Sequence, residues 1–204
     1  MGKTTISQDK IEQTIAFHGH WCPGLAIGIR AAEVALDQIG PSSDEEVVAV
    51  VETDMCGVDA IQFLTSCTLG KGNLIHLDYG KNAFTFMRRS DGKSIRIVTR
   101  PRLFDQEHKE VAQLHKKMAA QELGPQEQER LKKARAALSQ QIMEASLDDL
   151  FEVKPAAGTI PKKARILESV VCQACGERTM ESRIRRFMGQ YLCLPCFEAR
   201  ERRR

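Results

Sequence analysis

Four cysteines near the end of the 204-residue chain constrain its fold more than any other feature. They form two pairs, Cys172-x2-Cys175 and Cys193-x2-Cys196, separated by the seventeen residues 176–192. Two such pairs suit one tetrahedral zinc ion held by four thiolates. A segment of roughly 35 residues buries too little apolar surface to fold alone, so metal binding would supply much of its folding free energy. Four thiolates leave no open coordination position, and we expect this zinc to be structural.

The other three cysteines, Cys22, Cys56 and Cys67, lie in the N-terminal half. An odd total of seven cysteines argues against a disulfide framework, and the distribution predicts two separate chemical centres. The N-terminus has no apolar leader segment, and no apolar run approaches the ~20 residues of a membrane span. We therefore expect a cytoplasmic protein without a membrane partner.

The stretch His18-Gly19-His20-Trp21-Cys22 brings two imidazoles and a thiol within five residues. In an extended loop, positions i, i+2 and i+4 place their side chains on one side, so all three can converge on one ion. The loop is not a complete site, and we expect Cys56 and Cys67 to complete it, because each lies where a regular element meets a loop. The alternative is that these are hydrogen-bonded structural histidines and buried free thiols.

The apolar pattern of residues 1–104 mixes helices with strands. The β-branched run Glu46–Thr53 is typical of a buried strand. The pattern predicts helices over 8–17, 23–39 and 58–66, and strands over 46–53, 74–79, 83–88 and 94–99. This order indicates an α+β fold with a mixed β-sheet flanked by helices.

Residues 105–150 are charged, rich in alanine and glutamine, and carry no strand signals. Gly124-Pro125 divides them into two helices, so we expect a helical hairpin that docks on the core or on a second subunit. Because the hairpin could dock on a second subunit, we expect a homodimer. The predicted organisation is an α+β core at 1–104, a helical extension at 105–150, a linker at 151–168 and a four-cysteine finger with a basic tail at 169–204.

The basic tail favours an acidic or phosphate-bearing partner. Residues 178–204 contain eight arginines against three acidic residues, although the net charge of the whole chain is only +3. The segment has few aromatic residues interleaved with the arginines, which disfavours nucleic acid as the partner.

Three stretches carry a resemblance to a known family. Phe17–Ala32, which reads FHGHWCPGLAIGIRAA, resembles the opening signature of the FmdE family. Asp54–Leu74 and Asp78–Phe86 resemble the second and third blocks of that family. The family takes its name from the FmdE subunit of formylmethanofuran dehydrogenase, a molybdenum or tungsten enzyme of methanogens. The C-terminal cysteine segment resembles the fingers of the DksA/TraR group, or a treble clef generally.

The resemblance implies a thioredoxin-like mixed sheet and an active site at these motifs, with zinc or another transition metal bound there. It also implies subunits of a molybdenum or tungsten enzyme as partners, in a context related to one-carbon metabolism and methanogenesis. It implies no defined reaction, because the family's own activity is poorly defined and many relatives occur outside methanogens.

In the first functional hypothesis the chain is an enzyme or part of one, such as a metal-dependent oxidoreductase. His20, Cys22, Cys56 and Cys67 would bind the metal, and His18 would be a further ligand or an acid–base group.

Four more polar residues have assigned roles in this hypothesis. Asp54 and Asp59 would orient the ligands, and Asp54 and Lys71 would also be catalytic. Lys71 and Asn73 would hold an anionic substrate or cofactor. Two other hypotheses stay open: an accessory module that binds a protein or nucleic acid through the finger and tail, and a non-catalytic metal carrier.

Overall fold

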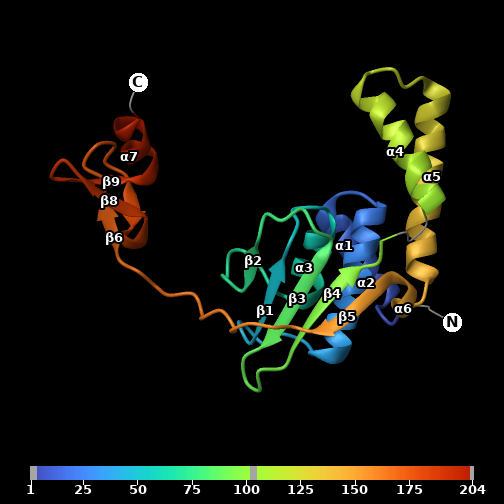
Figure 1. Ribbon diagram of the computed structural model, residues 1–204, viewed down its shortest axis with the longest axis horizontal. Helices are drawn as coiled ribbons and strands as arrows, with labels where there is room; N and C mark the ends of the chain where they lie inside the picture. The colour runs from blue at the N-terminus through green and yellow to red at the C-terminus, as the bar shows by residue number, and fades with distance from the viewer. Residues whose placement is uncertain (1–3, 102–104, 203–204) are drawn as a thin grey trace. The chain divides into compact units, whose positions relative to one another are not determined.

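The computed structural model describes residues 4–101 and 105–202, and of residues 105–108 the backbone alone. The chain forms two compact units, residues 1–163 and 164–204 (Figure 1). In the first unit the elements are α1 (Gln8–His18), α2 (Pro23–Gln38), β1 (Val47–Val51), α3 (Gly57–Thr65), β2 (Leu74–His76), β3 (Ala83–Arg88), β4 (Ser94–Thr99), α4 (Asp105–Ala119), α5 (Pro125–Glu144), α6 (Leu147–Leu150) and β5 (Phe151–Pro155).

The first unit is built on a five-stranded mixed sheet of order β2-β1-β3-β4-β5. Strands β1 and β2 are parallel and α3 connects them, whereas every other neighbouring pair is antiparallel. Ala49 at the centre of β1 lies opposite Leu74 of β2 and Phe86 of β3. The predicted α+β class with a mixed sheet and flanking helices is confirmed, and its assignment as thioredoxin-like stays a prediction.

One face of the sheet packs against α1, α2 and α3 (Figure 1). Helix α2 is buried along most of its length, because its small residues let neighbouring elements approach its backbone. The closest approach is at Gly28, where a methyl group would overlap the carbonyl oxygen of Gly57, the first residue of α3. This contact brings the N-terminal ends of α2 and α3 together.

The charged segment forms the predicted helical hairpin, α4 and α5. The C-terminal half of α5 joins the main core through Leu138, Ile142 and Met143. The buried Arg30 of α2 donates to the carbonyl oxygen of Ala145 at 2.8 Å, directly after α5. The hairpin therefore docks on the core of its own chain, one of the two outcomes expected from the sequence.

The segment 151–155 differs from its expected role as part of a linker. Phe151–Pro155 form β5, an edge strand that pairs with β4. Phe151 is 2% exposed and Val153 packs against the core. Every second residue of this short strand therefore faces the core, as expected for a β-strand. Pro155 ends the strand, where the missing N–H is tolerated because the strand lies at the sheet edge.

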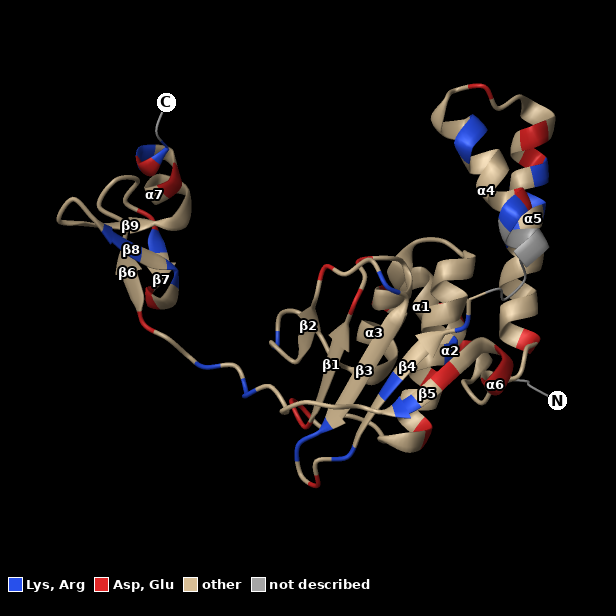
Figure 2. Ribbon diagram, viewed as in Figure 1, with Lys and Arg blue, Asp and Glu red and all other residues tan. Residues whose placement is uncertain are grey.

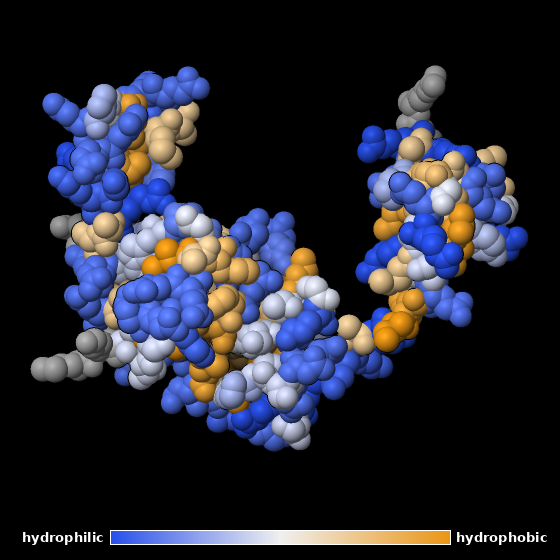
Figure 3. Space-filling view, turned by 180° about the vertical axis from the view of Figure 1, so that it is seen from behind, coloured by the Kyte–Doolittle hydropathy of each residue, from blue (hydrophilic) through white to orange (hydrophobic). Residues whose placement is uncertain are grey.

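Not all apolar residues of the first unit are buried. Figure 3 shows a band of hydrophobic surface, bordered by polar residues, on the side opposite to the view of Figure 1. Phe17 at the end of α1 is exposed and its ring lies 5.6 Å from that of Phe63. Met55 and Leu69 are exposed as well. Among the described residues, no helix is both long and apolar enough to cross a membrane.

The second unit contains two short hairpins and a helix. Its elements are β6 (Ser169–Val171), β7 (Arg178–Met180), the 3-10 helix η1 (Glu181–Arg183), β8 (Ile184–Phe187), β9 (Gln190–Cys193) and α7 (Leu194–Glu201). Strands β6 and β7 form one hairpin, and β8 and β9 form the other. The core consists of Cys172, Leu192 and Cys193, with Phe187 and Phe197 against it. Two of the three core residues are thus cysteines, whereas the core of a larger domain consists mainly of apolar side chains.

Candidate metal centres

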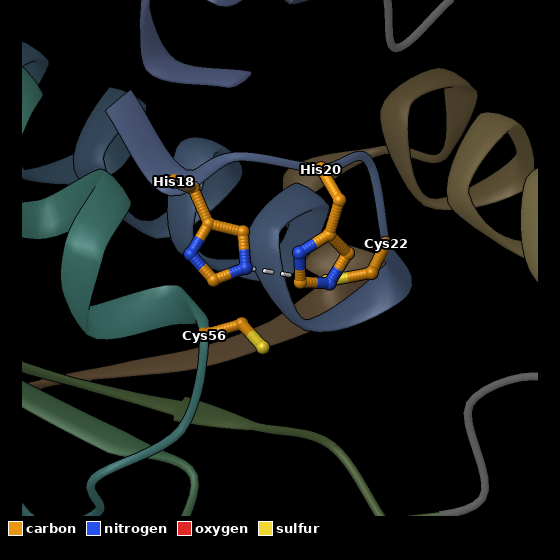
Figure 4. Close-up of side chains that lie close together, drawn as sticks. All are labelled: His18, His20, Cys22 and Cys56. Carbon is orange, nitrogen blue, oxygen red and sulfur yellow. Dashed lines mark hydrogen bonds between the residues drawn. The ribbon is translucent and has the colours of Figure 1, made fainter. Parts of the chain in front are cut away.

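Four side chains converge in the first unit, and we call them the N-terminal cluster: His18, His20, Cys22 and Cys56. One ligand atom from each lies within 4.8 Å of the others (Figure 4). His18 is the last residue of α1, and Cys22 and Cys56 directly precede α2 and α3. Three helix ends therefore hold three of the four side chains, while His20 lies in the loop between α1 and α2.

Local chain geometry explains why the loop folds in this way. Gly19 ends α1 in the left-handed region, at φ 91°, which glycine adopts without a steric penalty. Pro23 occupies the first turn of α2, where its missing N–H removes no hydrogen bond. The Cys22 Sγ accepts from the backbone N–H of Leu25 at 3.4 Å. The side chain of Cys22 is thereby both the N-cap of α2 and a member of the cluster.

A carboxylate fixes the orientation of His18. The Nδ1 of His18 lies 2.7 Å from Oδ2 of Asp59 in the first turn of α3, and its Nε2 lies 4.0 Å from Cys22 Sγ. With the proton held at Nδ1 by the carboxylate, Nε2 offers its lone pair to the cluster. Asp59 therefore occupies the orienting position expected from the sequence.

The electrostatics of the cluster suit a cation. Partial desolvation lowers the pKa of His20, and the neighbouring His18 and Arg135 act in the same direction, which favours the neutral, metal-binding imidazole. Burial raises the pKa of Cys56, and the adjacent Cys22 adds to the effect. A bound cation would offset the repulsion between two thiolates. Two thiols and two imidazoles are a donor set that fits zinc and other borderline-soft metal ions.

A cavity of about 350 Å³ adjoins the cluster. His18, Cys56 and Asp59 form its wall on the cluster side. The expected catalytic residue Asp54 also lines it and is exposed to solvent. The remaining polar lining is Thr53, Gln62 and His76, and the exposed Met55 and Leu69 contribute apolar surface. A small polar molecule in this cavity would contact the cluster.

Cys67 does not join the cluster, contrary to the expectation from the sequence. It follows the C-terminal end of α3, whereas Cys56 precedes the N-terminal end, and the nine residues of α3 correspond to about 13 Å of helix. The Cys67 thiol is fully buried and donates to the carbonyl oxygen of Val47 at 3.4 Å. Burial raises its pKa, so it is an uncharged core thiol.

Lys71 and Asn73 also lie outside the cluster and its cavity. Asn73 is fully buried, its amide nitrogen donates to the carbonyl oxygens of Asp44 and Val47, and its Oδ1 accepts from the N–H of Thr68. The Nζ of Lys71 donates to the same Asp44 carbonyl at 3.2 Å. Both side chains bind the backbone around the start of β1, and the buried Asn73 is not exposed to a substrate or cofactor.

Arg135 was not identified from the sequence as a residue near the site. This residue of α5 is near enough to His20 to affect its pKa. No local signal marks it, since α5 carries many cationic residues and 115 positions separate the two side chains.

The four C-terminal cysteines form the second centre, as expected. One sulfur from each lies within 4.8 Å of the others, and Cys175 Sγ is 3.9 Å from Cys193 Sγ. The backbone N–H groups of Cys175, Cys193 and Ala174 lower the pKa of Cys172 to about 6. Cys172 is therefore largely a thiolate at neutral pH, the form that binds metal ions. Four sulfurs at this spacing fit a tetrahedral metal ion.

Comparisons with known proteins show which proteins the chain resembles. The crystal structure of an FmdE-like protein from Syntrophus aciditrophicus, described as similar to the FmdE component of a tungsten formylmethanofuran dehydrogenase, covers 100% of both chains. Its TM-score is 0.62 at 23% sequence identity, which shows a shared fold. A protein of Archaeoglobus fulgidus named "Probable S-adenosyl-L-methionine-binding protein" is 34% identical over 188 residues, or 88% of this chain. The chain spans about half of that relative, 50% of its length.

The family comparison covers the N-terminal cluster and the five-stranded sheet. The family model described as "FmdE, Molybdenum formylmethanofuran dehydrogenase operon" matches residues 17–152, which is more than half of the chain. The match begins one residue before His18 and reaches into β5. The chain belongs to the FmdE family.

Proposed function

We propose that the N-terminal cluster binds one transition-metal ion, zinc in the first instance, and forms the active centre of a metal-dependent enzyme or of one of its subunits. The convergence of two thiols and two imidazoles within 4.8 Å carries this proposal. The carboxylate of Asp59 on His18 supports it, because metal-binding histidines usually donate their second ring N–H to such a group. The cavity beside His18 and Cys56 provides space for a substrate.

We assign the exchangeable ligand position to His20. His18, Cys22 and Cys56 are held at helix ends and are at least half-buried, whereas His20 is exposed and lies in a loop. Catalytic zinc sites usually combine three protein ligands with one position open to water or substrate. A zinc ion held by these three residues would polarise a carbonyl group or lower the pKa of water to about 7.

The other residues of the cavity would bind and orient the substrate. Asp59 holds the proton of His18 at Nδ1 and keeps the imidazole plane fixed. Asp54, Gln62 and His76 offer hydrogen-bonding groups on the cavity wall. Asp54, exposed at this wall, is the residue we propose as an acid–base group.

Metal analysis of ligand variants tests this proposal. The protein is purified without oxygen, loaded with Co²⁺, and examined by metal content and absorption. We expect Cys56→Ala to lose the N-terminal ion and His20→Ala to retain it with a changed Co²⁺ spectrum. Cys67→Ala is the matched control, since this buried thiol lies outside the cluster, and it should behave as the wild type. Equal loss of metal in His20→Ala and Cys56→Ala would remove the proposed exchangeable position.

We propose that the second centre holds a structural zinc ion in a treble-clef finger. Its four sulfurs and the two cysteines in the small core support this role. The all-thiolate Co²⁺ charge-transfer bands of this centre distinguish its ion from the one at the N-terminal cluster.

The operon in the family description supports a partnership with a molybdenum or tungsten formylmethanofuran dehydrogenase. We propose that the chain acts as a subunit of that enzyme or as a paralogue of its FmdE component. Affinity purification from a host that makes such an enzyme, followed by identification of bound proteins, tests this role. Sedimentation of the purified protein tests the expected homodimer.

A second candidate function is an accessory module that binds an acidic partner through the second unit. Arg185 and Arg186 are exposed on β8, and no ion pair involves any arginine within the described residues 164–202 (Figure 2). Binding to an acidic protein or to nucleic acid should then fall as salt rises. Arg185→Gln with Arg186→Gln should weaken it, and a protein that binds neither at low salt would contradict this candidate.

A further inference from the structure

A second cavity borders the N-terminal cluster at His20. It has a volume of about 620 Å³, within the range typical of small-molecule sites. His20 and Trp21 of the cluster loop form one wall, and Met118 of α4 and Leu131 of α5 belong to the opposite wall. His20 therefore borders both the cluster and this cavity.

The walls combine apolar surface with two cations. Lys132 and Arg135 of α5 line the cavity, and none of the described residues that line it is a carboxylate. Among the described side chains, neither cation forms an ion pair or a side-chain hydrogen bond. Their neighbours on α5 are paired, because Arg130 lies 2.7 Å and Lys133 3.9 Å from a glutamate. On α5, the two cations without a carboxylate partner among the described side chains are thus the two that line the cavity.

Apolar walls together with two cations favour an anionic ligand that has an apolar body. Charges attract more strongly beside apolar walls than in open water, and a guanidinium can bind a carboxylate or phosphate through two parallel hydrogen bonds. The ring of Trp21 offers a flat face on which an aromatic or similarly flat body can stack. A cationic ligand would meet repulsion from both Lys132 and Arg135.

We propose that this cavity binds a small organic anion, a carboxylate or a phosphate ester with a flat apolar body. The anionic group lies on Arg135 and Lys132, and the apolar body packs on Trp21 and Leu131. The bound molecule then lies next to His20 and so beside the metal ion. That last step rests on the proposed function of the cluster, whereas the binding itself does not.

Trp21 provides a direct readout, because it is the single tryptophan of the chain. Metal-free protein is titrated with phenyl phosphate and with phenylacetate, and its tryptophan emission is followed. We expect a saturable change with at least one of these anions and none with benzylamine over the same range. The anion that binds more tightly identifies the acidic group. The absence of a saturable change with both anions would overturn the proposal.

Paired variants test the assignment of the two cations. Lys132→Gln with Arg135→Gln should weaken anion binding at least about tenfold, since two charge-assisted contacts are removed. Arg130→Gln with Lys133→Gln removes the same charge from the same helix outside the cavity and should leave the affinity unchanged. Equal weakening in both pairs would mean that only the net charge of α5 matters and would contradict the proposed site.

The cobalt-loaded protein separates this inference from the proposed function. A ligand beside His20 should change the Co²⁺ absorption of the N-terminal cluster. If the cluster binds no cobalt while Trp21 still responds to the anion, the proposed function fails and the anion site stands. If cobalt binds but Trp21 does not respond, the anion site fails and the metal centre stands.

Discussion

His18 and Asp59 are joined by a short hydrogen bond, with Nδ1 of the imidazole 2.7 Å from Oδ2 of the carboxylate. The two residues are 41 positions apart and belong to different helices, α1 and α3. Their bond connects the end of one helix to the first turn of the other. It therefore orients the imidazole of His18 and also couples the two helices next to which His18 and Cys56 lie.

Replacing this carboxylate should weaken metal binding without removing a ligand. We expect Asp59→Asn to lower the affinity of the N-terminal cluster about 10- to 100-fold, since loss of such a partner leaves the ring orientation and basicity of His18 unsupported. Competition with a chromogenic chelator measures the change. Asp54→Asn is the control, because Asp54 lines the same cavity without a hydrogen bond to the cluster. Equal affinity of Asp59→Asn and wild type would contradict the role of the carboxylate.

The crossing of α2 and α3 should not tolerate a methyl group. Gly28→Ala places Cβ against the carbonyl of Gly57, and backbone at both sides leaves no flexible side chain to move. We expect a loss of about 1–3 kcal/mol in the free energy of unfolding, as for other overpacked sites. Urea denaturation measures it. Gly70→Ala serves as the control, because a methyl group there meets nothing within 4 Å.

The protonation of His20 should depend on Arg135. The pKa of His20 lies below its usual range because of desolvation, His18 and Arg135. Since the folded pKa is depressed, the neutral imidazole contributes stability at pH above about 6.5 that is lost as pH falls through the folded pKa. Arg135→Gln should raise this pKa towards 6.5, as measured by NMR titration of metal-free protein, whereas Arg130→Gln should not. An unchanged pKa in Arg135→Gln would show that the guanidinium does not act on His20.

Removal of the C-terminal metal should affect the second unit alone. The core of that unit includes two of the four cysteines, so without a metal ion its apolar contacts are too few to hold the fold. We expect Cys196→Ser to abolish amide protection in residues 169–202 and to leave the main core unchanged. Hydrogen exchange followed by mass spectrometry distinguishes the two units. Persistent protection of the second unit in the variant would show that the metal is not required for folding.

Much of the secondary structure was predictable because its signals are local. Pro23 at the start of α2 and the nearly continuous β-branched residues of β1 identify both elements from sequence alone. Strand β5 was not identified, because Pro155 and the glycine and proline that follow resemble a linker. Strand β5 pairs with β4, which lies more than fifty positions earlier in the chain. A local sequence pattern does not identify a partner so far away.

The candidate site was predictable to the extent that its ligands are close in sequence. His18, His20 and Cys22 converge as expected, and Cys56 joins them. The assignment of Cys67 was wrong, because a helix between two cysteines separates them by its own length. The positions of Lys71 and Asn73 depend on hydrogen bonds to the backbone around β1, which the sequence does not reveal.

The order of the residues around the N-terminal cluster has a consequence for the synthesis of the protein. All four members of the cluster lie within residues 18–56, whereas Lys132 and Arg135 follow much later in the chain. Because a chain emerges from the ribosome from its N-terminus, the four proposed ligands are all available before the helical hairpin exists. An ion can therefore reach the cluster while that side is still open to solvent. Completion of α5 then adds the wall beside His20, so an ion that binds after synthesis would meet a finished fold and one that binds during synthesis a partial fold.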